Sequence, residues 1–210
     1  VTEEILSFEA LMRWNSVEFG RVSPAKFIPI AEDTRLIVPI GEWALRRACD
    51  EAAHWPGHVK VAVNVSAEQM LDANFASTVV SALAASGLAP ERLELEVTES
   101  IFLRDGGAAQ STLNQIQSLG CKLALDDFGT GYSSLGYLRN NRFNTIKIDR
   151  SFVTGAAKDS PESLAIIRAV VAMCDALGME TTAEGVESER ELERIRQLGC
   201  SKIQGFLFGR

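Results

Sequence analysis

Short extended runs alternate with longer helical stretches along almost the whole chain, and this alternation limits the possible folds more than any other feature. The runs with the length and alternating pattern of strands are seven: 5–13, 60–66, 92–98, 121–126, 145–149, 180–184 and 202–206. Apolar residues recur at helical spacing in the stretches 36–54, 74–86, 108–119, 161–177 and 188–198. Strands that alternate with helices form parallel βα units, so we predict an α/β fold.

Glycines mark the ends of four predicted helices, directly before the next strand. They are Gly87, Gly120, Gly178 and Gly199. Glycine at this position lets the chain adopt the left-handed conformation that ends many helices. Two segments, 15–24 and 129–141, break the rhythm, and we predict that they are loops. Long loops after strands are where barrels carry function.

The two faces of each predicted strand differ in polarity, because successive side chains point to opposite sides. In residues 93–97 one face is apolar, whereas the other carries Glu94 and Glu96. The corresponding face of the other strands carries Glu9, Leu11, Arg13, Asn64, Asp126, Lys147, Asp149 and Glu184. The apolar face must pack on helices, so the polar face points inward. Inward charge of this density is costly unless ions neutralise it, which predicts an acidic metal site at the mouth of a TIM-like (β/α) barrel.

Asp126 and Asp127 are the sharpest local signal. Adjacent residues of a strand face opposite ways, so we expect the strand to end at Asp126 and the next loop to begin at Asp127. An isolated pair of aspartates can simply cap a loop. Here Gly129 and Gly131 follow, and a loop with such hinges can close over a site.

Oxygen ligands and a cation lie near the ends of other predicted strands. Glu9, Asn64 and Glu96 offer hard oxygen atoms suited to Mg²⁺ or Mn²⁺. A lysine beside such a site can stabilise charge on a phosphoryl group, which is one interpretation of Lys147. The alternative is a structural ion pair between Lys147 and Asp149 inside the barrel.

Several further residues have two interpretations each. Glu184 and Glu187 flank another strand end and could form a surface turn instead of a site. Arg13 suits a phosphate group, but it could also pair with an interior carboxylate. Gln204 is more typical of a hydrogen-bonding residue in the interior than of a catalyst, and Glu99 more typical of a residue that holds a loop than of a metal ligand.

Composition excludes some classes of protein. A formal net charge of −7 argues against an extended contact with duplex nucleic acid, which needs clustered Lys and Arg. No apolar run approaches the ~18 residues of a membrane span, so we expect no membrane contact by these residues and a cytoplasmic location for them, while the parent protein could be anchored in a membrane elsewhere. The widely spaced cysteines indicate reduced thiols, and His54 and His58 are expected to face solvent.

Short motifs in a fixed order cover almost the whole chain. They are Glu9-Ala10-Leu11, Val63-Asn64-Val65-Ser66, Glu96-Val97-Thr98-Glu99, Asp126-Asp127-Phe128-Gly129-Thr130-Gly131, Lys147-Ile148-Asp149, Glu184-Gly185-Val186-Glu187 and Gln204-Gly205-Phe206. In this set the chain resembles the EAL-domain family of bacterial cyclic-di-GMP phosphodiesterases. The resemblance implies hydrolysis of cyclic di-GMP to the linear dinucleotide pGpG at the barrel mouth, through two-metal activation of water.

The resemblance also implies a role for each matched residue. The implied metal ligands are Glu9, Asn64, Glu96, Asp126, Asp127 and Glu184. Glu184, Lys147 and Asp149 are implied in catalysis, and it stays open whether Glu184 is chiefly a metal ligand or the general base. The implied substrate contacts are Arg13, Leu11, Gln204 and Glu187, with Glu99 anchoring the loop after Asp127.

The implied cofactors are two Mg²⁺ or Mn²⁺ ions, and Ca²⁺ is expected to bind but inhibit. We expect residues 1–210 to be a single EAL-like barrel domain, truncated at both ends relative to the family and lacking the first strand and the closing helix. The expected partners are cyclic di-GMP, a second copy of the chain, and a regulatory domain elsewhere in the parent protein.

Two other functions fit parts of the pattern. A catalytically inactive cyclic-di-GMP receptor would pass a signal to a partner, although such proteins are expected to lose ligands and this chain keeps every matched carboxylate. A barrel lyase or aldolase would use Lys147 as a Schiff base, which needs a desolvated lysine, and the neighbouring Asp149 argues against it.

Overall fold

The computed structural model of the chain describes residues 4–129, 138 and 142–209. Most of the predicted loop 129–141 therefore lies outside the described residues. The chain divides into two compact units, residues 1–122 and 123–210, and each unit is described by itself. Among the described residues, no helix is both long and apolar enough to cross a membrane.

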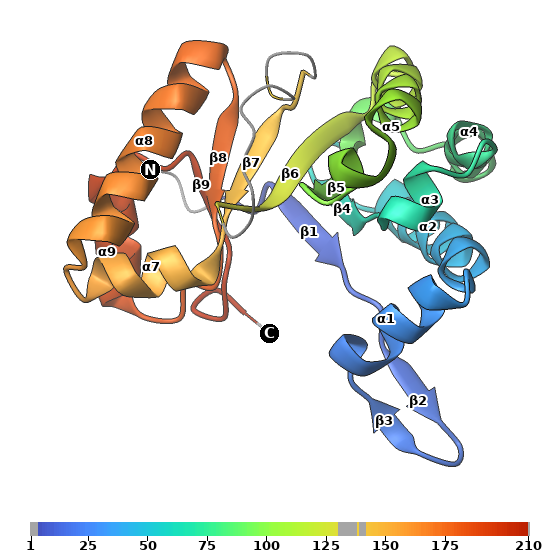
Figure 1. Cartoon of the computed structure of the whole chain (residues 1–210), viewed down its shortest axis with the longest axis horizontal. Coiled ribbons are helices and arrows are strands. Elements are labelled where there is room, and N and C mark those ends of the chain that lie inside the picture. Colours follow the sequence, from blue (N-terminus) through green and yellow to red (C-terminus); the bar gives the residue numbers. More distant parts are fainter. Residues whose placement is uncertain (1–3, 130–137, 139–141, 210) are drawn as a thin grey trace. The chain divides into compact units, whose positions relative to one another are not determined.

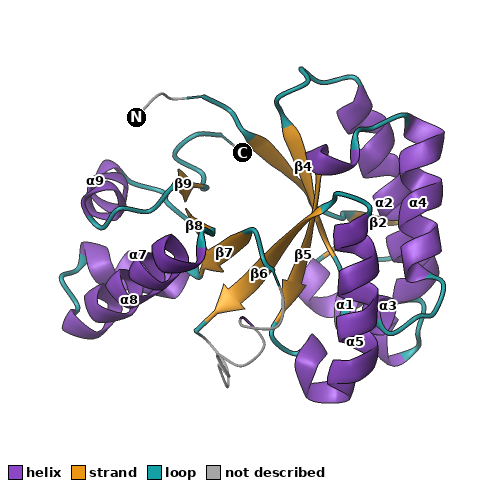
Figure 2. Ribbon diagram, turned by 90° about the horizontal axis from the view of Figure 1, so that it is seen from above, coloured by secondary structure: helices purple, strands orange, loops and turns teal. Residues whose placement is uncertain are grey.

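The first unit contains three parallel strands with β4 in the middle. The strands are β1 (Ser7–Ala10), β4 (Lys60–Asn64) and β5 (Leu93–Thr98). The helices are α1 (Pro24–Asp33), α2 (Ile37–Ala53), α3 (Ala67–Met70), α4 (Phe75–Ser86) and α5 (Ile101–Ser118), with the 3₁₀ helix η1 (Pro90–Arg92). Helices α2 to α5 lie on the same side of β4 and β5 in both views (Figures 1 and 2).

Branched and long aliphatic side chains form the core of this unit. Val61, Val63 and Leu95 of the strands are buried, as are Leu45 of α2 and Leu113 of α5. Burial of one such side chain contributes about 1.5–3 kcal/mol relative to leaving it in water. The apolar strand face and the apolar stripes of the helices therefore hold the strand ends in place.

The predicted loop 15–24 contains regular structure, so this prediction was wrong. A short antiparallel hairpin forms from β2 (Trp14–Ser16) and β3 (Gly20–Val22). The Trp14 ring meets the Phe27 ring of α1 edge-on, with 5.8 Å between centroids. Strands of three residues are too short to produce a recognisable alternation, which explains why the sequence did not reveal them.

The second unit continues the parallel pattern. Its strands are β6 (Lys122–Phe128, whose first residue belongs to the first unit), β7 (Thr145–Ile148), β8 (Glu180–Ala183) and β9 (Lys202–Ile203), and they pair in this order. Its helices are α7 (Arg150–Ala157), α8 (Pro161–Leu177) and α9 (Glu189–Gln197). All three helices lie on one side of β7 and β8 (Figures 1 and 2).

The glycine signals at the helix ends are confirmed. Gly87 and Gly178 are the C-caps of α4 and α8, with φ of 70° and 69°. Gly120 and Gly199 follow the C-caps of α5 and α9, with φ of 95° and 84°. The predicted helix 108–119 begins earlier, at Ile101. The prediction started too late because Gly106 and Gly107 are poor helix formers, yet the helix continues through them. Helices α1, α3 and α7 were not predicted.

Candidate metal centre

Three carboxylates meet at the strand ends of the second unit. Asp126 and Asp127 lie near the end of β6, and Glu184 directly follows β8. One ligand oxygen from each residue lies within 4.8 Å of the other two. Three hard oxygen donors at this spacing can bind one divalent cation.

The backbone of β6 explains how two adjacent aspartates contribute to one cluster. The strand does not end at Asp126, as we expected, but runs to Phe128. Its register against β7 shifts between Leu125 and Phe128, and Asp127 has a left-handed φ of 54°. This irregularity breaks the strict alternation of side chains, so both carboxylates are available on the same side.

Lys147 of β7 forms ion pairs with two carboxylates of this cluster. Its side chain is only 2% exposed, and its Nζ lies 2.7 Å from Oε1 of Glu184 and 3.5 Å from Oδ1 of Asp126. A buried ammonium is stable only with such partners. One lysine balances only part of the charge of three carboxylates, so the cluster keeps a net negative charge.

The charge of the cluster also affects Asp127. Burial raises the pKa of its carboxyl group, repulsion from Asp126 and Asp149 adds to the increase, and Lys147 opposes it. A nearby cation stabilises a carboxylate that is partly desolvated and repelled by its neighbours. The donor set and the charge therefore fit a divalent metal ion such as Mg²⁺ or Mn²⁺.

Asp149 has a structural contact next to this cluster. It is the N-cap of α7, and its Oδ1 accepts hydrogen bonds from the backbone N–H of Ser151 at 2.9 Å and from the Ser151 hydroxyl. The capping bonds fix the carboxylate at the point where the chain leaves β7. Asp149 is thus held at the start of α7, two residues after Lys147.

The first unit gathers a second group of predicted ligands at its own strand ends. Asn64 closes β4 and is paired in register with Glu96 of β5, which is 2% exposed. Nδ2 of Asn64 donates a hydrogen bond to Oε1 of Glu9 at 2.5 Å. Nδ2 is thus used by this bond, and Oδ1 is the atom through which an amide can bind a hard cation.

The chain directly after Asn64 is fixed by a capping box. The Ser66 hydroxyl caps α3 by accepting a hydrogen bond from the Gln69 backbone N–H, and Oε1 of Gln69 accepts one from the Ser66 backbone N–H. Gln69 is buried although it is polar. This turn limits the freedom of Asn64 at the end of its strand.

The remaining predicted residues lie at separate places within their units. Arg13 and Leu11 follow β1 and are exposed. Gln204 follows β9 and is half-buried, and the Glu187 side chain pairs with Arg150 at 2.8 Å. Their predicted roles in substrate binding remain predictions.

Two further expectations concern Glu99 and the two histidines. Glu99 is buried just beyond the end of β5, while its predicted loop partner lies outside the described residues. His54 and His58 are exposed, as expected. Sequence reasoning gave Arg150 no role; the signal available was a cation directly after Lys147-Ile148-Asp149.

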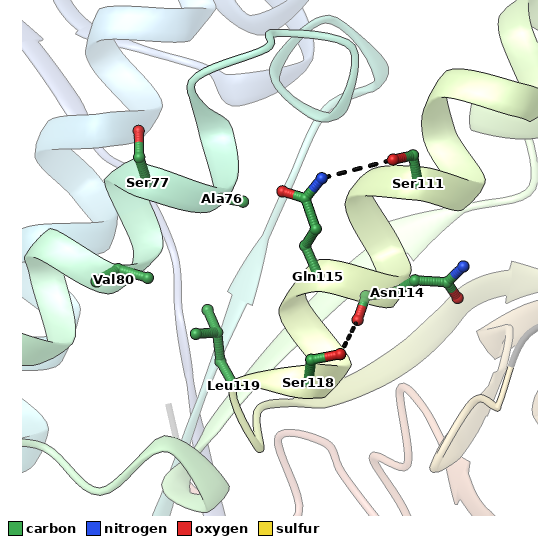
Figure 3. Close-up of a pocket in the computed structure, with 8 residues that line it drawn as sticks. All are labelled: Ala76, Ser77, Val80, Ser111, Asn114, Gln115, Ser118 and Leu119. Carbon is green, nitrogen blue, oxygen red and sulfur yellow. Dashed lines mark hydrogen bonds between the residues drawn. The ribbon is translucent and has the colours of Figure 1, made fainter.

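A cavity of about 540 Å³ lies elsewhere, between α4 and α5 (Figure 3). Its lining is uncharged and includes Ser77, Val80 and Asn114. Gln115 reaches back to the hydroxyl of Ser111 on its own helix. No predicted site residue lines this cavity, and a wall without charge does not suit a phosphate-bearing ligand.

The fold and the carboxylate clusters define the class: an α/β protein with parallel strands whose carboxyl ends carry acidic residues suited to divalent metals. Within this class the chain belongs to the EAL domain family, because the model of that family matches residues 1–210. The resemblance noted in the sequence is confirmed.

Curated relatives agree with this membership. The chain is 52% identical over 208 residues to an uncharacterised protein, y4lL, of Sinorhizobium fredii. The matched region covers 99% of this chain and 25% of that protein. It is 44% identical over 210 residues to the bifunctional diguanylate cyclase/cyclic di-GMP phosphodiesterase MucR of Pseudomonas aeruginosa, covering 98% of this chain and 30% of MucR. The chain thus spans about a quarter to a third of the length of these relatives.

A solved structure confirms the fold class. The structure described as the PaMucR phosphodiesterase in complex with c-di-GMP matches with a TM-score of 0.92 and 43% identity, over 99% of this chain and 85% of that chain. The chain therefore has the TIM-like (β/α) barrel fold class of EAL domains.

Proposed function

We propose that this chain is a divalent-metal-dependent phosphodiesterase that hydrolyses cyclic di-GMP to pGpG. The observation that carries the proposal is the cluster of Asp126, Asp127 and Glu184 around the buried Lys147, in a member of the EAL domain family. MucR, a relative at 44% identity, is named as a cyclic di-GMP phosphodiesterase, which supports the same substrate here.

The two groups of carboxylates would hold two metal ions. By the resemblance to the EAL-domain family, the ligands that we propose for one ion are Glu9, Asn64, Glu96 and Asp126, and those for the other are Asp127 and Glu184. Metal ions held by these residues would supply the activation of water and the stabilisation of phosphoryl charge that hydrolysis of a phosphodiester needs. Attack of the water oxygen on phosphorus, with departure of the 3′ oxygen, opens the cyclic dinucleotide to the linear product.

Protein side chains complete the reaction. Lys147, held by Glu184 at 2.7 Å, would stabilise negative charge on the phosphoryl oxygens, and Asp149 would lie close to the attacking water. Glu184 has two candidate roles, as a metal ligand and as the acceptor of the water's proton. Arg13 would hold the other phosphate by charge-assisted hydrogen bonds.

The remaining assignments are part of the same proposal. Leu11, Gln204 and Glu187 would contact the substrate, and Glu99 would anchor the loop that follows Asp127. We further propose a cytoplasmic location, a regulatory domain elsewhere in the parent protein, and pairing of two copies of the chain. Sedimentation of the protein with metal and substrate tests the pairing, which a purely monomeric species would contradict.

Two rival functions make different demands on the same residues. A receptor would bind cyclic di-GMP without product, although nothing in receptor function requires the retained ligand set. A lyase would need Lys147 as a neutral amine, but its ammonium is paired with two carboxylates. The contacts of Lys147 thus favour the hydrolase over the lyase.

Incubation of the protein with cyclic di-GMP and Mn²⁺ or Mg²⁺, with and without chelator, tests the proposal. We expect pGpG to accumulate with either metal, and to stop forming after chelation or with Ca²⁺ alone. Binding of cyclic di-GMP without any product at high protein concentration would contradict the hydrolase and support the receptor.

A further inference from the structure

The segment 184–188 joins β8 to α9 and begins with Glu184 of the carboxylate cluster. Arg150, the first residue of α7, reaches this segment from the end of the neighbouring strand β7. Its Nη2 donates a hydrogen bond to Oε2 of Glu187 at 2.8 Å. The side chain therefore links the chain that follows Lys147 to the chain that follows Glu184.

Arg150 touches the same segment a second time, through its aliphatic stem. Gly185 has a left-handed φ of 65°, and a Cβ at this position would lie 2.4 Å from Cγ of Arg150. The glycine is required because any side chain would push the segment off the arginine. Arg150 thus contacts the segment on both sides of Val186, at Gly185 by packing and at Glu187 by charge.

The opposite side of the segment is also held. Val186 is 0% exposed, and its N–H donates to the carbonyl of Gln204 at 3.1 Å. The N–H groups of Glu187 and Ser188 both donate to Oε2 of Glu191, at 2.8 and 3.0 Å. These bonds tie the segment to β9 and α9, whereas Arg150 ties it to β7 and α7.

We propose that Arg150 is a positioning residue for the reaction: it fixes the segment after β8 so that the carboxylate of Glu184 stays against Lys147 and the aspartates. The inference rests on the proposed hydrolysis, because the orientation of Glu184 matters for turnover only at a catalytic centre. Arg150 itself touches neither the substrate nor the metals in this account. Its effect passes through Gly185 and Glu187.

The test compares Arg150→Ala with Arg190→Ala in the intact chain. Arg190 is a matched control, because it is an exposed arginine of the same unit that pairs with Asp159 at 3.3 Å and takes no part in the site. Hydrogen exchange of the backbone amides of Val186 and Glu187, measured without substrate, reports the position of the segment. Steady-state kinetics with Mn²⁺ reports turnover.

We expect Arg150→Ala to speed exchange of these two amides about tenfold or more, and Arg190→Ala to leave it near the wild-type rate. The kcat of Arg150→Ala should fall about tenfold. Arg150→Lys keeps the stem and the charge and should restore most of both. In a Glu187→Gln background, which already lacks the charge partner, the further loss from Arg150→Ala should be smaller.

Exchange that is unchanged in Arg150→Ala, or raised equally by Arg190→Ala, overturns the positioning role. A fall in kcat that follows the loss of thermal stability in both variants also overturns it, because general destabilisation would then explain the effect. Failure of the wild-type protein to hydrolyse cyclic di-GMP overturns the proposed function instead. Exchange without substrate distinguishes the two failures.

Discussion

At the scale of single residues, the charge balance around Lys147 is the main physical fact. Its ammonium group is withdrawn from water, which is costly unless partners compensate. Asp126 and Glu184 supply that compensation, and Asp127 adds a third carboxylate whose pKa is raised by burial and by its neighbours. The resulting excess of negative charge favours binding of a divalent cation at this cluster.

The cysteines give a prediction at this scale. Burial raises the pKa of Cys49 and Cys174 to about 12, and of Cys121 and Cys200 to about 11. The thiolate is the reactive form, so all four should alkylate slowly at pH 8 and faster as the pH rises toward these pKa values. Only Cys200 is partly exposed, so it should react first.

Iodoacetamide labelling followed by peptide mass analysis measures these rates. Denatured protein is the control, in which all four thiols should react quickly and alike. Cys49 is buried in α2. Labelling of Cys49 in the native protein as fast as Cys200 would contradict this burial.

Single residues also set the limit of what the sequence could predict. Side-chain chemistry and strand parity identified Asp126 and Glu184 as site residues, and the structure brings their carboxylates together. Parity placed Asp127 in the following loop, because no sequence signal announces a backbone irregularity inside a strand. Arg150 was missed for a similar reason, since its contacts depend on the close approach of Gly185.

At the scale of elements, strand ends and the turns after them determine the site. The turn after β8 packs so closely on the turn after β9 that a Cβ on Gly205 would lie 2.0 Å from the carbonyl oxygen of Val186. Backbone atoms cannot move aside as a flexible side chain can. The structure therefore requires glycine at this position.

Gly205→Ala should destabilise the protein by about 1–3 kcal/mol, because the added methyl group forces the two turns apart. For a chain of this size the melting temperature should fall by roughly 2–4 °C for each kcal/mol. The control is Gly57→Ala, where an added Cβ meets nothing within 4 Å. Equal melting temperatures for the two variants would contradict the close packing of these turns.

Elements differed in how well the sequence revealed them. All seven predicted strands are present, because each has an apolar face that packs on helices and a polar face that points the other way, and this alternation is visible in the sequence. The hairpin of β2 and β3 and the short helices α3 and α7 offered too few residues for a periodic signal. This hairpin makes tertiary contacts, such as that of Trp14 with Phe27. Contacts between residues far apart in the chain leave no periodic pattern in the sequence.

At the scale of the whole molecule, the net charge is −7 and carboxylates cluster at the strand ends. We therefore expect a bound divalent metal ion to stabilise the folded protein. A ligand that binds only the folded chain stabilises it by about 2.7 kcal/mol at one hundred times its Kd. Saturating Mn²⁺ should therefore raise the melting temperature by roughly 5–10 °C over chelator-treated protein.

Matched variants locate this effect in the cluster. Glu184→Gln should reduce the Mn²⁺-dependent shift to less than half, whereas Glu193→Gln, on the exposed side of α9, should keep it. Differential scanning fluorimetry measures all three proteins under the same conditions. A shift of the same size in Glu184→Gln would place the stabilising metal elsewhere.

The ordered motifs predicted the family and the fold class of the whole molecule, because each motif comes from a separate strand end and chance rarely reproduces the full set in order. They could not predict the regulation of the protein. A regulatory input of the kind proposed above would act through surface residues, and these residues carry no recognisable motif.

The central claim is that the carboxylate cluster binds the metal ions that drive hydrolysis, and Asp127→Asn tests it most directly. The amide keeps the size of the side chain but removes one negative charge from the second metal. Phosphate contacts by the other metal and Arg13 would remain, so cyclic di-GMP binding supported by Ca²⁺ should stay near the wild-type affinity.

Turnover with Mn²⁺ and binding with Ca²⁺ are measured on one preparation of Asp127→Asn and of the wild type. We predict that turnover falls about a hundredfold or more, because in the proposed two-metal mechanism the variant would lose one of the metals that activate the water, and each 1.36 kcal/mol at the transition state is about tenfold in rate. Near-normal turnover of Asp127→Asn would contradict the two-metal account, and lost binding would place Asp127 in substrate recognition instead.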